Sequence, residues 1–262
     1  MRFQIRESAK STATLFLRGV GVYLTAALIL ALVTVFCSLP PGLKPFGSSS
    51  NLYTIYALIA FANLVIVYFY GFVAAYASSQ PRSGRARIKE SLRLAFERYT
   101  SVLKSLGVVL AAFVISAVPM WFVLQLGVLE FFPNFPKHLV PTAHKMFSMV
   151  LAAFIAKEYM FMLPIAVGEG WGTPNPAHKS RALVSGQRGK AYLLCLGYGL
   201  ASAGLMLVES AVNPEAHIRL SVWAATHMDY LVRIAFSFAG NVLSAVWIIF
   251  LTALSRQLKA PA

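Results

Sequence analysis

Acidic residues are scarce in this chain of 262 residues, which contains 9 Asp and Glu against 23 Lys and Arg. Charged residues of both signs make up only 12% of the sequence, whereas soluble domains carry about a quarter. Hydrophobic residues, by contrast, make up 58%. This composition argues against an ordinary water-soluble core and favours a protein that is surrounded by lipid.

Cysteine and the signatures of enzymes are also nearly absent. The two cysteines, Cys37 and Cys195, have no pairing or metal-ligand spacing, so we expect them to be small apolar packing residues. The sequence contains no P-loop, nucleophile elbow, HExxH helix or pair of catalytic carboxylates. We therefore expect neither enzymatic activity nor a cofactor.

Long apolar runs recur along the chain, and each is long enough for an α-helix to cross the roughly 30 Å of hydrocarbon in a bilayer. We predict an all-α, polytopic membrane protein with six transmembrane helices, in which residues 1–262 form one integral membrane domain. The predicted spans run from about Val20 to Cys37, Leu52 to Tyr76, Leu106 to Leu129, Met146 to Val167, Ala191 to Val208 and Tyr230 to Leu254.

Three short basic segments precede the odd-numbered spans, and their periodicity predicts amphipathic helices that lie at the membrane interface. The net charge of +14 is concentrated in these segments between spans, so anionic lipid headgroups are the expected partner and nucleic acid is not. The predicted apolar faces contain Ile5, Ala9, Ala13 and Phe16; Ile88, Leu92, Ala95, Phe96 and Tyr99; and Ala177, Ser180, Leu183, Val184 and Gln187. The predicted headgroup contacts are Arg85, Arg87, Lys89, Arg93, Lys179, Arg181 and Arg188.

Basic residues also predict the orientation. Most of them lie on the side of the termini, and only Lys44, Lys137, Lys145 and Arg219 fall on the other side. The positive-inside rule then places both termini in the cytoplasm, and the expected location is the inner membrane of a bacterium.

The short helices indicate an internal repeat. Ser8, Ser91 and Ser180 each begin the same series of amphipathic helix, span, outer loop and span, and they are 83 and 89 residues apart. We predict three parallel repeats, over residues 1–80, 81–172 and 173–262, related by an axis along the membrane normal. A chance similarity is the alternative, since connecting loops are often basic.

A few polar residues fall within the predicted spans. Lys157 and Glu158 are the most unusual, because a charge at the bilayer centre costs about 2.5–3.5 kcal/mol. Asn63 and Asn241 lie near the middle of the second and sixth spans. We predict that these four residues meet in a polar centre. Interhelical hydrogen bonds that hold the bundle together are favoured over an ion or substrate path.

Polar residues also gather at the outer boundary. Glu209 and Arg233 end and begin the two helices of one hairpin, so they are expected to form an ion pair. His138, His144, His217 and His227 lie on the same side, but their spacing matches no compact ligand motif, and we expect no metal site.

One stretch of about 30 residues carries a family-like pattern. Leu163-Pro164, Gly168-Glu169-Gly170 and the series Ser180, Leu183-Val184, Gly186 form a proline-containing span, a Glu-Gly turn and a Ser-x-x-Leu-Val-x-Gly helix. This stretch resembles uncharacterised six-span bacterial membrane proteins of the YciC type and the related membrane domain of some glycerophosphodiester phosphodiesterases. The resemblance implies the span plan but no reaction.

Two functional classes follow from the sequence. The first is a non-enzymatic protein that organises the membrane, in particular by binding anionic lipid through its basic helices. The second is a transporter or permease component that uses the polar residues at mid-membrane.

Overall fold

Helices are the only regular elements in the part of the chain that this computed structural model describes, residues 3–38, 52–83, 88–131, 140–172, 175–212 and 222–259. The predicted all-α fold class is confirmed. The helices are α1 (Ile5–Arg18), α2 (Val20–Ser38), α3 (Leu52–Ser83), α4 (Ile88–Glu97), α5 (Tyr99–Phe131), α6 (Val140–Tyr159), α7 (Met162–Glu169), α8 (Pro176–Val184), α9 (Arg188–Val212) and α10 (Val222–Lys259).

Several of these helices are long and apolar enough to cross a membrane. Five such segments occur among the described residues: Val20–Cys37, Tyr56–Ser79, Met149–Glu169, Arg188–Glu209 and Tyr230–Leu258. A sixth is present if α4 and the following part of α5, which meet at an angle of 59°, are counted as one bent span. The chain therefore has the helices of a multi-pass membrane protein.

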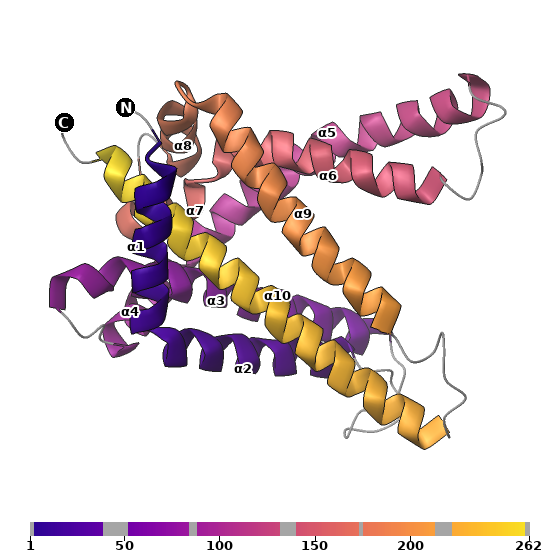
Figure 1. Cartoon of the computed structure of the whole chain (residues 1–262), viewed down its shortest axis with the longest axis horizontal. Helices are drawn as coiled ribbons and strands as arrows, with labels where there is room; N and C mark the ends of the chain where they lie inside the picture. Colours follow the sequence, from indigo (N-terminus) through magenta and orange to yellow (C-terminus); the bar gives the residue numbers. More distant parts are fainter. Residues whose placement is uncertain are drawn as a thin grey trace.

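The short helices α1, α4 and α8 each lead into a long helix after a break of one to three residues, at Gly19, at Arg98 and at 185–187. Figure 1 shows these short helices gathered with both termini at one end of the long helices. The C-terminal ends of α2, α5 and α9 lie toward the other end. The molecule thus has one end rich in short helices.

The packing of the short helices follows a regular order. Helix α4 packs against α3, which precedes it, and α8 packs against α6 and α7 in the same way. Helix α1 packs against α10, the last helix of the chain. Similarly, α5 lies against α3, α9 against α6, and α2 against α10. The first and last segments therefore close the bundle, and the two termini lie near each other in Figure 1.

The serines at the start of each predicted repeat are all buried, and each bonds the long helix that the short helix packs on. Ser8 donates to Oε1 of Gln257 on α10 at 2.7 Å. Ser91 lies 3.3 Å from the hydroxyl of Ser79 on α3. Ser180 bonds the end of α6. The three serines thus make equivalent packing contacts.

Most residues of the apolar faces predicted for the first two short helices are turned away from the protein. Helix α1 buries Ser8, Thr12 and Leu15, and α4 buries Ser91 and Ala95. Small side chains allow the close approach of another helix, whereas bulky ones hold it away. On the outward side, Ile5, Ala9, Ala13, Ile88, Leu92 and Phe96 are exposed.

Helix α8 differs from the other two short helices. Its predicted face is turned inward, with Ser180 and Val184 fully buried and Leu183 partly buried. The two cysteines, Cys37 on α2 and Cys195 on α9, are also buried, and neither forms a disulfide. They are the packing residues that the sequence predicts.

Candidate functional site

The end of the fourth predicted span is broken into two helices. Helix α6 ends at Tyr159 and α7 begins at Met162, with a turn between them. Pro164 explains the break, because its ring clashes with the carbonyl of Met160, four residues earlier, and it has no N–H to donate. A break of this kind leaves backbone groups that need other partners.

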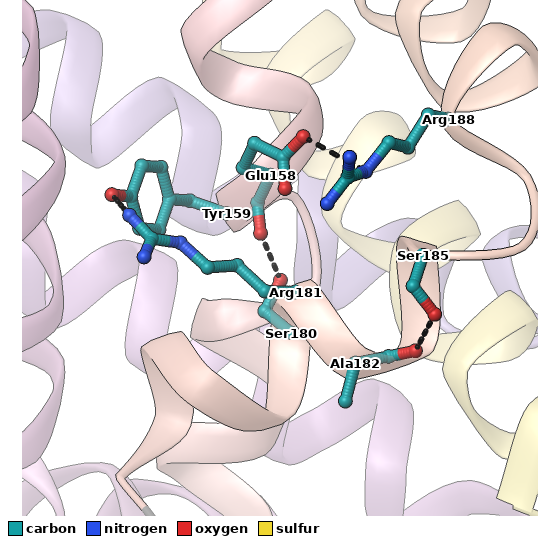
Figure 2. Close-up of polar contacts among 7 residues, drawn as sticks. All are labelled: Glu158, Tyr159, Ser180, Arg181, Ala182, Ser185 and Arg188. Carbon is teal, nitrogen blue, oxygen red and sulfur yellow. Dashed lines mark hydrogen bonds and ion pairs between the residues drawn. The ribbon is translucent and has the colours of Figure 1, made fainter.

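Ser180 supplies those partners. Its hydroxyl donates to the carbonyl of Glu158 at 2.9 Å and accepts from the N–H of Phe161 at 3.2 Å. Ser180 is fully buried. Figure 2 shows its hydroxyl directed at the carbonyl of Glu158. A hydroxyl that donates to one backbone group and accepts from another stabilises the break and is not free to act as a nucleophile.

The local sequence explains why Ser180 points into the break. Asn175 caps α8, with Oδ1 accepting from the N–H of His178 at 2.9 Å, and Pro176 occupies the first helical turn. Pro176 and Ser180 lie four residues apart, on one face of the helix, and both are buried. Both residues are typical of a helix start at the positions they occupy here.

Charged side chains surround the buried serine. Glu158 lies 3.4 Å from Arg188, whose side chain is largely exposed, and Lys179 lies 2.5 Å from Glu169. Arg181 bonds the hydroxyl of Tyr159 and stacks on its ring (Figure 2). Exposed pairs of this kind contribute about 0–1 kcal/mol each to stability. Arg181 and Arg188 are exposed, and Lys179 is half-buried.

Glycine is required where the span meets the connection to α8. Gly170 has a φ of 76° and a ψ of −169°, a conformation that essentially only glycine adopts. The guanidinium of Arg98, at the break between α4 and α5, occupies the position that a Cβ of residue 170 would need. Gly170 therefore allows the Arg98 side chain to lie directly against the connection between α7 and α8.

The four polar residues predicted to form one centre each contact a different partner. Asn63 is exposed and donates to the carbonyl of Ile59 in its own helix at 2.8 Å. Asn241 donates to the carbonyl of Ala27 on α2 at 3.3 Å. Lys157 lies over the ring of Phe154, and Glu158 pairs with Arg188. Asn241 and Glu158 thus each contact another long helix, α2 and the start of α9, whereas Asn63 and Lys157 contact their own helix.

The structure reveals a polar contact between long helices that the sequence analysis missed. The hydroxyls of Tyr198 on α9 and Ser244 on α10 lie 3.0 Å apart. Tyr70 on α3 interacts with both of them. Tyrosine and serine are common in membrane helices, so nothing in their spacing distinguishes these residues in the sequence.

The remaining predicted site residues lie in several places. Lys89 and Arg93 are exposed on α4, whereas Arg85 and Arg87 lie outside the described residues. Arg93 bonds Glu97 at 2.7 Å, and this hydrogen bond and the charge of the carboxylate raise the pKa of Arg93. Glu209 on α9 and Arg233 on α10 belong to helices that pack together, and their ion pair stays a prediction.

Two apolar grooves lie beside short helices. The first, of about 420 Å³, is formed by α2, α3 and α4 and is lined by Gly21, Leu30, Phe72 and Leu92 among others. The second, of about 530 Å³, is formed by α1, α9 and α10 and is lined by Ile5, Ala9, Gly197 and Trp247 among others. We call them the α4 groove and the α1 groove.

No cluster of three or more His, Cys, Asp or Glu side chains that could hold a metal ion occurs within the described ranges. The four histidines predicted at the outer boundary have side chains outside the described part.

No protein-family model matches the chain, and it has no significant match among curated proteins or solved structures. The resemblance to YciC-type proteins therefore stays a prediction.

Proposed function

We propose that this is a non-enzymatic membrane protein that binds anionic lipid headgroups and so organises the lipid around it. The observation that carries this proposal is the placement of exposed basic side chains on short helices at one end of the apolar spans, Lys89 and Arg93 on α4 and Arg181 on α8. Basic residues near a membrane surface attract anionic lipids by about 1 kcal/mol each.

The same end is proposed to be cytoplasmic, in the inner membrane of a bacterium. Both described ends of the chain lie there with the short helices, as an even number of spans requires (Figure 1). The excess of Lys and Arg near these span ends supports the assignment, because cytoplasmic segments are enriched in basic residues.

A threefold internal repeat is part of the proposal. It is supported by the order of the helices, by the packing of each short helix on the long helix of another segment, and by the buried serines Ser8, Ser91 and Ser180. The three short amphipathic helices would then present their basic residues around one pseudo-threefold axis, at a common depth in the interface.

Lipid binding tests the function. Purified protein in non-ionic detergent is titrated with fluorescent phosphatidylglycerol and phosphatidylcholine of the same chain length. The double variant Lys89→Gln/Arg93→Gln is expected to bind phosphatidylglycerol roughly 30-fold more weakly, because two charges near the headgroup are lost. Glu97→Gln is the matched control, since it breaks the Arg93 pair but keeps both cations. Equal binding of the two lipids by the unaltered protein would contradict the proposal.

Transport is the alternative function, and it depends on polar residues within the spans. The separate contacts of Asn63, Asn241 and Glu158 give it less support than the basic surface gives to lipid binding. Uptake by proteoliposomes that is lost on changing Lys157 or Glu158 would favour transport instead.

A further inference from the structure

The helices beside the two grooves carry the same six-residue pattern. Residues 5–10 read Ile-Arg-Glu-Ser-Ala-Lys and residues 88–93 read Ile-Lys-Glu-Ser-Leu-Arg. Both have isoleucine, a basic residue, glutamate and serine in order, and a second basic residue in the sixth place. The corresponding part of α8, Ala177–Ala182, shares only the serine. The pattern therefore marks the two short helices that border a groove.

Each position of the pattern has the same surroundings in the two helices. The first and fifth residues line the groove, Ile5 and Ala9 in one helix and Ile88 and Leu92 in the other. The serine is buried against the neighbouring long helix in both. The second and sixth residues are exposed basic side chains: Arg6, Lys10, Lys89 and Arg93.

The shape of the grooves fits one hydrocarbon chain. The α4 groove follows α2 from Gly21 to Leu30, which is about 14 Å of helix at 1.5 Å per residue. One leaflet of the bilayer core is about 15 Å thick, half of the whole. The linings of the α4 groove and of the α1 groove are almost entirely apolar. A chain that enters beside the short helix would cross its leaflet within the groove.

We infer that the α1 and α4 grooves each hold an acyl chain of one anionic phospholipid, whose phosphate lies at the basic pair of the adjoining hexapeptide. The apolar residues of the pattern then contact the chain, and the basic residues at the next position of the helix contact the headgroup. This inference rests on the proposed function and specifies it: two lipids are held at defined places, one beside α1 and one beside α4.

Two glycines provide a test of the grooves that spares the fold. Gly21 lines the α4 groove and Gly197 the α1 groove, and a Cβ at either would have no atom within 4 Å. Leucine at these positions would fill the groove. Gly204 on α9 has the same open surroundings but lines neither groove, so Gly204→Leu is the matched control.

Native mass spectrometry then counts the lipids retained from phosphatidylglycerol-containing micelles. We expect two on the unaltered protein and on Gly204→Leu, one on Gly21→Leu or Gly197→Leu, and none on the double variant. Retention by the double variant equal to that of Gly204→Leu would overturn the inference and leave the proposed function standing. If phosphatidylcholine is retained as well as phosphatidylglycerol yet lost in the double variant, the grooves hold chains but the anionic preference, and with it the proposed function, is wrong.

Discussion

The hydroxyl of Ser180 bonds backbone groups at the break between α6 and α7, which Pro164 introduces. Pro164 removes a backbone hydrogen bond from the end of the span. The backbone groups at the break are buried, so water does not satisfy them. The serine hydroxyl is small enough to enter and can both donate and accept. It therefore stabilises the break from a separate helix, 22 residues away from Glu158 in the chain.

We expect Ser180→Ala to lower the free energy of unfolding by about 2–4 kcal/mol, because a buried carbonyl and a buried N–H would each lose a partner. Unfolding in mixed micelles with increasing dodecyl sulfate measures this change. Ser185→Ala is the control: its hydroxyl bonds Ala182 at an exposed position, and the expected change is within about 0.5 kcal/mol. Equal costs for the two variants would show that burial at Ser180 is unimportant.

Gly170 makes a second prediction at this scale. Gly170→Ala should destabilise the protein by about 1–3 kcal/mol, since alanine is strained at this φ and its Cβ would displace the Arg98 guanidinium. Gly168→Ala, within α7 and with open space at its Cβ, should be neutral or slightly stabilising. The same unfolding assay compares them, and a tolerated alanine at 170 would mean that the turn can adopt another conformation.

At the scale of elements, the break between α6 and α7 and the helix α8 form one unit. Alanine at position 164 would restore an N–H that can bond the carbonyl of Met160, so the span could continue as one helix. The backbone groups now held by Ser180 would then find partners within that helix. The serine and the proline should therefore be energetically coupled.

A double-mutant cycle of Pro164→Ala and Ser180→Ala measures this coupling. We expect Ser180→Ala to cost at least about 1 kcal/mol less in the Pro164→Ala background than in the unaltered protein. Strict additivity of the two changes would show that the break is fixed by surrounding packing and not by the proline.

The helices themselves were largely predictable from the sequence, because apolar length is a strong signal. The first predicted span, Val20 to Cys37, agrees with the apolar part of α2, and the predicted start of the fifth lies three residues inside α9. The inward faces of α1 and α4 were not predictable from hydrophobicity. In a protein within lipid, close packing by Ser8 and Ser91 decides which face meets another helix, and the bulky apolar residues remain outside.

The site was predictable only in part. The cap of α8 at Asn175 could be predicted, because asparagine followed by proline is a local signal of a helix start. The partners of Glu158 and Asn241 depend on which helices adjoin, and periodicity within one helix contains no such information. The contact between Tyr198 and Ser244, 46 residues apart in sequence, also joins two helices and was missed for the same reason.

At the scale of the whole molecule, the arrangement of short helices predicts a topology that can be measured. A fluorescent protein fused after Ala262 should be fluorescent, and alkaline phosphatase fused there should be inactive, because the C-terminus is proposed to face the cytoplasm. A fusion inserted at Lys137, between the third and fourth predicted spans, should give the opposite pair of results. Active phosphatase at both places would contradict an orientation with both termini inside.

The contact between α1 and α10 also means that α1 is synthesised long before the helix on which it packs. Ser8 and Gln257 are 249 residues apart, so at 5–20 residues per second the ribosome needs about 12–50 s to make the partner of the first helix. During that interval the face of α1 that packs on α10 has no partner. Its outward residues Ile5 and Ala9 can bind the bilayer surface in the meantime. The earliest helix to be made is thus among the last to be docked, and a ribosome that stalls before α10 would leave the beginning of the chain, as well as its end, unassembled.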